Sequence, residues 1–321
     1  MEKGWTLYRY SAIIMENAAI RVVMLPGKGM DIVECLYKPR DVDVTAATPW
    51  GFTEDEIGTF LDRYEGGFQI VFPNGGPPSD YRGAWLGQHD EVALGRWQWQ
   101  DHEDEAGVSV TATTMLKKTP FRYQRKVQLN AQEAVLHLED TVTNLSPFEQ
   151  EVMWGQHLAF GPPFLSPSCR FASGAQEVLV VEESLTSRRF KPGRYAWPYV
   201  ERAEGGLWDL RQVPAKDGRH DMAYLVNFLE GWYTLENPQL GVGIRVEWDT
   251  EAWPCCWVWQ ECGADGYPWY GRHYSLGLEP FHGYPTQGLS NAIRNGSTLK
   301  IKGGCAITGY MRLALYEVND D

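Results

Sequence analysis

Short runs of alternating side chains recur from one end of this chain to the other, and they constrain its fold more than any other feature. Each run is rich in β-branched and aromatic residues and is bounded by Gly, Pro, Asn or Asp. These properties are typical of half-buried strands joined by tight turns. The runs cover residues 19–25, 108–115, 123–129, 135–142, 178–181, 223–229, 243–248, 256–260, 274–278 and 306–316.

Helical periodicity is rare by comparison. Residues 54–64 carry apolar side chains at helical spacing and predict one or two amphipathic turns. No linker, low-complexity tract or internal repeat divides the 321 residues. The sequence therefore predicts one domain over residues 1–321, an all-β, large antiparallel β-sandwich with long loops and few short helices.

The charge balance argues against nucleic acid as a partner. The chain has 29 Lys and Arg against 42 Asp and Glu, a net charge of −13, and no long basic run. Phosphate backbones are bound mainly by Lys and Arg. The 14 Trp, 16 Tyr and 12 Phe, beside 33 Gly and 19 Pro, instead indicate a folded protein rich in strands and turns.

The start of the chain lacks the apolar segment of a signal peptide, because its apolar stretch covers only residues 12–15. No stretch approaches the roughly 18 apolar residues of a membrane span. We therefore expect a cytoplasmic protein with no membrane partner, and the pattern indicates no particular oligomeric state. The six cysteines form no CxxC pair and are expected to be reduced core thiols. A metal or redox role of Cys255, Cys256 and Cys262 is the alternative.

Two segments rich in turn residues depart from the strand pattern. Residues 66–78 are a strand running into a turn with many Gly and Pro, which either lines a site or turns a corner. Its Gly75-Gly76 pair lacks the GxGxxG spacing of a phosphate loop. In residues 87–99, His89 precedes two acids, which either orient its ring or form a solvated polar turn.

A third segment, residues 152–163, places a histidine among small neighbours. Strand alternation puts His157 on the same face as Gly155 and Ala159. Gly inside a strand often marks a close approach of a ligand, so the pattern suits the floor of a pocket. A core histidine that bonds to the backbone is the alternative.

The fourth segment, residues 267–285, places a glutamate among small neighbours. Alternation puts Glu279 on the face of Gly277 and Ser275. The carboxylate is then exposed, paired with Arg272 at a rim, or buried with a raised pKa for proton transfer.

At these segments the sequence resembles the aldose 1-epimerase (galactose mutarotase-like) superfamily, in particular a bacterial branch of it. The resemblance covers most of the chain, and the order and spacing of its short motifs make it specific. The matching motifs are residues 23–29, 72–74, the His89 turn, residues 144–146 before the His157 strand, and residues 278–280 and 283–285.

The resemblance implies a β-supersandwich fold and a role for each matched residue. His157 is expected to be the general acid and Glu279 the general base, while His89 contacts the sugar. The family has an Arg directly after Asn74, where this chain has glycine, and Arg82 or Arg63 is a candidate replacement. The sugar-binding Asp of the family is matched best by Asp221.

Mutarotation fits these residue types. A base removes the proton of the anomeric hydroxyl while an acid protonates the ring oxygen, and neither a metal nor another cofactor is needed. We therefore expect a small-molecule carbohydrate substrate, free or modified, with Asn74, Arg82, Asp221, Trp259 and Glu261 as binding residues. The matched segments hold no Lys or Arg cluster, which disfavours a phosphosugar.

Two other functions stay open. The first is a glycoside hydrolase, lyase or sugar isomerase on the same scaffold, in which Glu261, on one face with Trp257 and Trp259, supplies the second carboxylate. The second is a non-catalytic carbohydrate-binding protein, in which aromatic side chains stack on the sugar.

Overall fold

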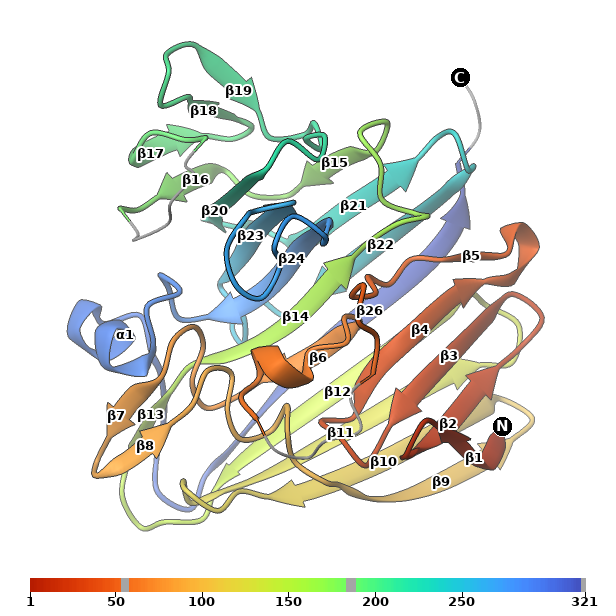
Figure 1. Cartoon of the computed structure of the whole chain (residues 1–321). Helices are drawn as coiled ribbons and strands as arrows, with labels where there is room; N and C mark the ends of the chain where they lie inside the picture. Colours follow the sequence, from red (N-terminus) through yellow and green to blue (C-terminus); the bar gives the residue numbers. More distant parts are fainter. Residues whose placement is uncertain (53–57, 183–188, 319–321) are drawn as a thin grey trace.

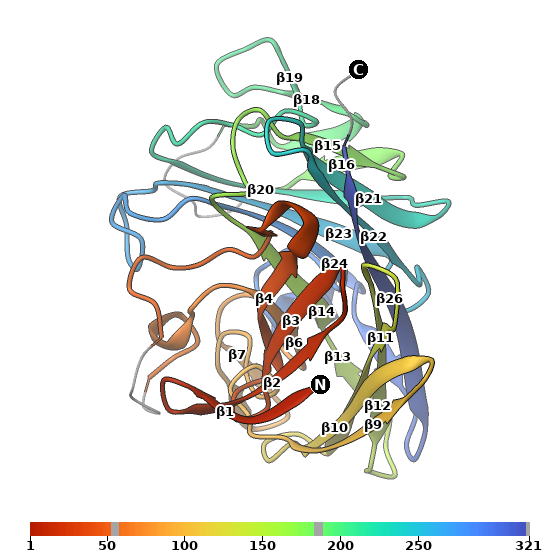
Figure 2. The same cartoon turned by 90° about the vertical axis from the view of Figure 1, so that its right-hand side faces the viewer.

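The computed structural model describes residues 1–52, 58–182 and 189–318, and its two large sheets lie face to face (Figure 1 and Figure 2). The first sheet has 12 strands among the described residues, and its pairings are antiparallel. In spatial order they are β1 (Glu2–Leu7), β2 (Tyr10–Glu16), β3 (Ile20–Leu25), β4 (Asp31–Tyr37), β6 (Phe68–Val71), β14 (Trp154–Phe160), β24 (Ser275–His282), β23 (Cys255–Cys262), β20 (Arg219–Val226), β16 (Glu177–Val180) and β17 (Gly193–Ala196), with β5 (Val42–Asp43) beside β4.

The second sheet has eight strands in the part of the chain that the structure describes. They are β15 (Arg170–Ser173), β21 (Gly231–Asn237), β22 (Val242–Trp248), β26 (Ala306–Glu317), β12 (Val135–Asn144), β11 (Phe121–Asn130), β10 (Gly107–Met115) and β9 (Gln98–Asp104). Three strand pairs complete the β-structure: β13 (Gln150–Val152) with β25 (Leu299–Ile301), β18 (Tyr199–Glu201) with β19 (Leu207–Asp209), and β7 (Ser79–Tyr81) with β8 (Ala84–Leu86).

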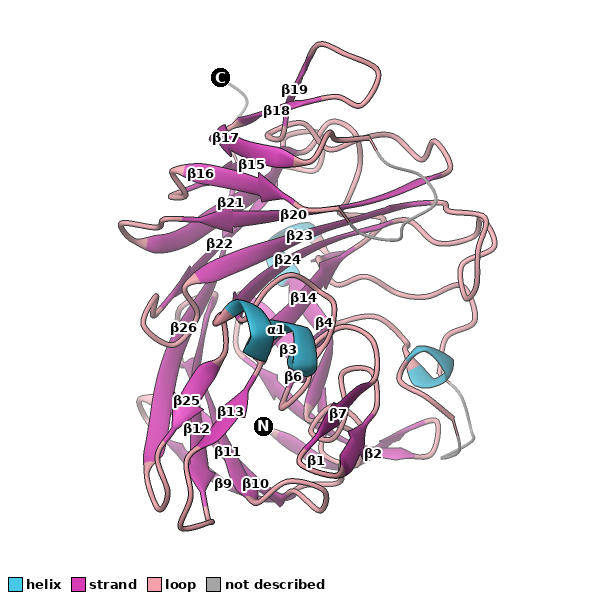
Figure 3. Ribbon diagram, turned by 90° about the vertical axis from the view of Figure 1, so that its left-hand side faces the viewer, coloured by secondary structure: helices cyan, strands magenta, loops and turns pink. Residues whose placement is uncertain are grey.

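Helical structure is sparse. The α-helix α1 (Leu289–Asn295) lies beside β7 (Figure 3), and its residue Ser290 bonds to Ser79. Turns of 3₁₀ helix cover Lys38–Arg40 and Leu61–Arg63. No helix in the described ranges has the length and apolar character needed to cross a bilayer.

The predicted all-β class and the predicted strands are confirmed. Each predicted run falls on a strand to within a few residues, although β20 ends at Val226 and leaves Leu229 exposed. The helix predicted over residues 54–64 falls partly on residues 53–57, outside the described residues; its described end is the 3₁₀ turn at Leu61–Arg63. The helix α1 was not expected from the sequence.

A continuous apolar core fills the space between the two sheets, with buried members from Ile13 to Leu315. A buried polar group crosses this core beside the apolar side chains. Arg125 on β11 makes two hydrogen bonds to Asp140 on β12, at 2.7 and 2.6 Å, and a third, at 2.6 Å, to Gln156 on β14. Because Gln156 also donates to Asp140, the charged pair is satisfied on both sheets, which ties β14 to the second sheet.

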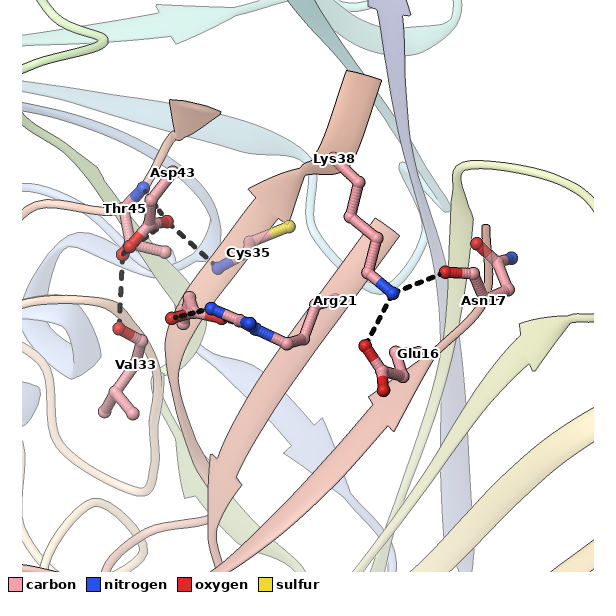
Figure 4. A network of polar contacts seen from close by, with 9 residues as sticks. Glu16, Asn17, Arg21, Val33, Cys35, Lys38, Asp43 and Thr45 are labelled. Carbon is pink, nitrogen blue, oxygen red and sulfur yellow. Dashed lines mark hydrogen bonds and ion pairs between the residues drawn. The ribbon is translucent and has the colours of Figure 1, made fainter. Parts of the chain in front are cut away.

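Polar side chains fasten the N-terminal strands to one another (Figure 4). Lys38 forms an ion pair with Glu16, and Asp43 accepts hydrogen bonds from the backbone N–H of Cys35 and from Thr45. These contacts hold β2 to β5 together beside β6, the strand next to β14.

All six cysteines are free thiols in the structure. Five are buried, as expected for core cysteines, whereas Cys305 is exposed. Cys255 and Cys256 are neighbours on β23 and, because the strand alternates, lie in different apolar clusters on its two faces.

Candidate active site

His157 and Glu279 meet on the outer face of the 12-stranded sheet, the face turned away from the inter-sheet core. They lie on the antiparallel neighbours β14 and β24, whose register pairs Ala159 with Gly277 and so places His157 opposite Glu279. Nε2 of His157 lies 3.7 Å from Oε1 of Glu279. The predicted alternation of both strands is confirmed, because their other faces pack into the inter-sheet core.

Both side chains are almost completely buried, His157 at 5% and Glu279 at 2% exposure. Burial lowers the pKa of His157 to about 4 and raises the pKa of Glu279 well above its usual range. Neither Nδ1 of His157 nor Oε2 of Glu279 has a hydrogen-bond partner among the described residues. Burial thus favours the neutral form of both groups, and each has one polar atom without a partner in the described part of the chain.

The small neighbours of these residues leave less room than the sequence suggested. A Cβ on Gly155 would lie 2.0 Å from the ring of Phe281, so that ring fills the space beside His157. A Cβ on Gly277 would lie 2.6 Å from Oε1 of Glu279, because the carboxylate folds back over this glycine. The two glycines therefore accommodate protein side chains, which corrects the expectation that Gly155 marks open space for a ligand.

His89 lies next to this pair. Its ring centroid is 5.8 Å from that of His157 and 4.7 Å from that of Phe60. The backbone N–H of Gly76 donates to Nδ1 at 3.3 Å, so Nε2 carries the proton of the neutral ring. Burial and the nearby His157 hold the pKa of His89 well below its usual range. The turn that lacks the family arginine thus contributes a backbone donor that orients His89.

Asn74 is buried and fully engaged by the protein. Its Nδ2 donates to the carbonyl oxygens of Pro77 and Gly87, at 3.0 and 2.7 Å, and its Oδ1 accepts the N–H of Leu289 at 2.7 Å. The residue therefore joins its own turn to the His89 loop and to the start of α1. These bonds give Asn74 a supporting position between the three segments, and its contact with a sugar stays a prediction.

Tyr64 is a site residue that the sequence analysis missed. Its ring lies 5.6 Å from the ring of His157 and 6.4 Å from that of Trp259, and its buried hydroxyl has no partner in the described part of the chain. Burial and the nearby Glu279 raise the pKa of Tyr64 well above its usual range. The only sequence signal was its place at the end of the predicted amphipathic stretch.

Aromatic rings form one wall of the site. The ring of Trp259 lies 5.5 Å from that of His157, and Trp269 stacks on His273 at 4.6 Å. Two polar atoms in this wall, Nε2 of His273 and Oγ of Ser275, are buried without partners in the described ranges. Unpartnered buried polar atoms are costly, so this group of them is typical of a site that binds a polar ligand.

Glu261 lies on the same face of the sheet, beyond Trp259. Its Oε1 accepts the N–H groups of Gly263 and Ala264, at 3.0 and 2.7 Å, and Oε2 is 3.4 Å from Nδ1 of His220. Burial raises the pKa of Glu261 to about 7 and lowers that of His220 to about 4. His220, which the sequence analysis did not single out, is thus a second histidine–glutamate contact on this face.

The structure does not bring Asp221 to this group. On β20, Asp221 pairs in register with Gln260, the residue that follows Trp259 on β23. Because side chains alternate along a strand, Asp221 lies on the face of the sheet opposite to Trp259. Its Oδ1 accepts the N–H of Arg189, and Oδ2 is 3.3 Å from Nε of the same residue. The position that the family match gave to Asp221 is occupied on the site face by His220.

The two arginines considered as replacements for the family arginine differ in setting. Arg82 is exposed at the β7–β8 turn, where it donates to the carbonyl oxygen of Glu149 at 3.1 Å and lies over the ring of Tyr81. Nothing in the structure brings it to His157. Arg63 is buried beside Tyr64 in sequence, and its Nε has no partner among the described residues.

A buried ionic group lies beside the site and reaches its face of the sheet at Gln69. Nζ of Lys28 lies 2.5 Å from Asp31 and 2.7 Å from Glu65, and Gln69 donates to Asp31 at 3.2 Å. Gln69 is the register partner of His157 across β6 and β14. Burial raises the pKa of Glu65 to about 7, and it also raises the pKa of Asp31. No group of three His, Cys, Asp or Glu side chains within the described residues is arranged as a metal site.

A family model described as "Domain of unknown function (DUF4432)" matches residues 10–313 of the chain. No curated protein matches it significantly.

Solved structures share the fold at low sequence identity. A galactose mutarotase-like protein from Clostridium acetobutylicum superposes with a TM-score of 0.71 at 15% identity, over 99% of this chain and 98% of that chain. A galactose mutarotase related enzyme from Lactobacillus acidophilus gives 0.69 at 15% identity, over 97% and 99%. A Klebsiella pneumoniae protein with a provisional assignment as an aldose 1-epimerase gives 0.73 at 12% identity, over 96% and 80%. The expected galactose mutarotase-like fold is thereby confirmed; at these identities the likeness concerns the fold alone.

Proposed function

This chain belongs to the DUF4432 family and has the galactose mutarotase-like fold, and we propose that it is an aldose 1-epimerase-like enzyme. It interconverts the anomers of a free or modified sugar by opening and closing the ring. Glu279 is the general base and His157 the general acid.

The observation that carries this proposal is the buried contact between His157 and Glu279. The two groups are 3.7 Å apart on neighbouring strands, and each has one polar atom without a partner in the described residues. A hemiacetal offers a hydroxyl proton and a ring oxygen on adjacent bonds of one carbon. An acid and a base fixed this close together can therefore reach both.

The proton count of the pair suits the reaction. A neutral imidazole and a protonated carboxyl, the forms that burial favours, hold as many protons as an imidazolium and a carboxylate. Hydrogen bonds from sugar hydroxyls to Oε2 of Glu279 favour the carboxylate, so substrate binding can draw one proton from Glu279 to His157. No exchange with solvent is needed for this change.

The ring then opens in one balanced step. Glu279 removes the proton of the anomeric hydroxyl, the bond from the anomeric carbon to the ring oxygen breaks as the carbonyl forms, and His157 gives its proton to the ring oxygen. Rotation of the free carbonyl and the reverse transfers give the other anomer, and the pair recovers its protons. His89 is the proposed donor to a sugar oxygen, which its proton on Nε2 supports.

The arrangement of Glu261 does not favour the hydrolase alternative. Glu261 pairs in register with Ser275, four residues from Glu279 and hence about 13 Å along the strand. Its carboxylate is also tied to the backbone of Gly263 and Ala264. A retaining hydrolase needs its two carboxylates about 5–5.5 Å apart, and an inverting one about 6.5–9.5 Å.

Anomeric exchange measured by NMR on a panel of free aldoses and uronic acids tests the proposal. The wild-type protein should accelerate exchange of at least one sugar, and Glu279→Gln should lower its rate by about 10²–10⁴-fold. Glu34→Gln, which removes a half-exposed carboxylate on β4, is the matched control and should leave the rate unchanged. Undiminished exchange in Glu279→Gln would reject the assignment of the base. Calorimetric binding of a sugar without any exchange would instead identify a carbohydrate-binding protein.

A further inference from the structure

We propose that Glu261 and His220 are positioning residues that fix the indole of Trp259 as the wall against which the sugar ring packs. This rests on the proposed function only in taking a sugar as the ligand. It gives Glu261 a role other than that of a second catalytic carboxylate.

The direction of the hydrogen bonds is set by the indole. Trp259 Nε1 lies 3.1 Å from Nε2 of His220, and an indole nitrogen can only donate. Nε2 of His220 must therefore be the acceptor, which leaves the proton of the neutral ring on Nδ1. Nδ1 lies 3.4 Å from Oε2 of Glu261, which accepts no hydrogen bond from the described residues, so this contact is electrostatic. A single tautomer of His220 thus accepts the hydrogen bond of the indole and places its own N–H group beside the carboxylate of Glu261.

We call the series Trp259, His220 and Glu261 the relay. Its far end, Glu261, is anchored to the backbone. Glu261 is completely buried, and its Oε1 accepts two N–H groups from the turn that follows β23, those of Gly263 and Ala264. Gly263 has a φ of +87°, a conformation that L side chains rarely adopt, so this turn depends on glycine. The carboxylate thus cannot swing without breaking two bonds.

The strand register holds the three side chains together. Trp259 and Glu261 share one face of β23, and His220 lies directly opposite Glu261 on β20. Neighbouring residues on one face of a sheet are close enough for these contacts without distortion.

Trp259, at the other end of the relay, borders the acid–base pair His157 and Glu279. The Trp259 ring lies 5.5 Å from His157, and its Cε3 would be 3.0 Å from a Cβ on Gly277, the residue over which the Glu279 carboxylate folds. Rotation of the indole would therefore change the space beside both His157 and Glu279. A ring fixed by its N–H presents its apolar face in one orientation, which suits stacking against a sugar.

Indole resonances of ¹⁵N-tryptophan-labelled protein test the relay directly. The Trp259 signal is assigned by its loss in Trp259→Phe. It should move toward the position of an indole without a hydrogen bond in His220→Leu and, less far, in Glu261→Leu. His220→Gln should restore it in part, because the glutamine oxygen accepts from the indole while its amide donates to Glu261. The Trp257 indole donates to the Gly283 carbonyl oxygen instead and should stay in place in every variant.

Kinetics separate positioning from catalysis. His220→Leu should raise KM about five- to tenfold, the scale of one aromatic contact, with kcat changed less than twofold, and His220→Gln should lie between it and wild type. An unmoved Trp259 resonance in His220→Leu overturns the relay, and a fall in kcat at unchanged KM overturns its positioning role. If no sugar is turned over, the proposed function fails while the resonance shifts still decide the relay.

Discussion

The carboxylate of Glu279 folds back over Gly277, two residues earlier on the same strand. A Cβ at this glycine would lie 2.6 Å from Oε1, the oxygen that faces His157, and 3.0 Å from Cε3 of Trp259. The glycine therefore provides the space in which the acid–base contact is made. The backbone conformation at Gly277 is one that any residue can adopt, so only the contacts of a side chain favour glycine here.

Gly277→Ala should consequently lower the rate of anomeric exchange without preventing folding. The added methyl must push the Glu279 carboxylate away from His157, and a displacement of about 1 Å costs on the order of 10²-fold in rate. The check is the NMR exchange rate, with far-UV circular dichroism to verify the fold. Gly266→Ala is the matched control, because a Cβ there meets nothing within 4 Å, and it should keep the wild-type rate. An equal loss in both variants would contradict the role given to Gly277.

The sequence was sufficient to predict the strands that carry this site and the faces that His157 and Glu279 occupy. Both predictions used a period of two, and strand alternation follows from backbone geometry alone. The same rule explains the failure at Asp221, where the match was one residue away from His220 and thus on the wrong face.

The contents of the space around the site could not be predicted in this way. Phe281 fills the room left by Gly155, and Tyr64 comes from a distant loop; both depend on how separate segments pack. The surroundings of the tryptophan rings could not be predicted either. Trp154 lies in the inter-sheet core and Trp257 stacks on Phe281, whereas Trp259 reaches the site. Alternation gave the face of each ring, but not its neighbours.

Because Gly155 and Phe281 are in contact, we expect substitutions at the two positions to have non-additive effects on the free energy of unfolding. Gly155→Ala brings a Cβ to 2.0 Å from the Phe281 ring and should lower the free energy of unfolding by about 1–3 kcal/mol, because an overpacked core must shift. Phe281→Leu alone should also destabilise, since it removes the ring that stacks on Trp257. In the double variant the smaller side chain makes room for the methyl group. Urea unfolding should therefore show a loss smaller than the sum of the two single losses, and simple additivity would contradict the contact.

The Arg125–Asp140 pair predicts an asymmetry between breaking and removing a buried ion pair. Asp140→Asn leaves the Arg125 guanidinium in the core without its countercharge and should cost about 3–5 kcal/mol of unfolding free energy. Arg125→Met combined with Asp140→Leu removes both charges and should cost less than Asp140→Asn. Urea unfolding measures both. Glu247→Gln, at a half-exposed pair with Arg245, should cost less than about 1 kcal/mol.

The buried His273 predicts how stability depends on pH. Burial and the nearby Lys216 hold its pKa at about 4 in the folded protein, below the value of 6.5 for a free side chain. The unfolded chain therefore binds the proton first. The stability that the neutral ring contributes is complete above about pH 6.5 and is lost as the pH falls from there to about 4. At 1.36 kcal/mol per pKa unit the difference amounts to about 3 kcal/mol.

His273→Gln should accordingly reduce the fall in unfolding free energy between pH 7.5 and pH 4 by about 3 kcal/mol relative to wild type. Urea unfolding at the two pH values gives this difference directly, and any constant cost of the substitution cancels in it. Val178→Ala, a truncation in the inter-sheet core that removes no titrating group, controls for destabilisation as such and should keep the wild-type difference. If His273→Gln loses as much unfolding free energy on acidification as wild type, the buried neutral His273 is not the cause of the pH dependence.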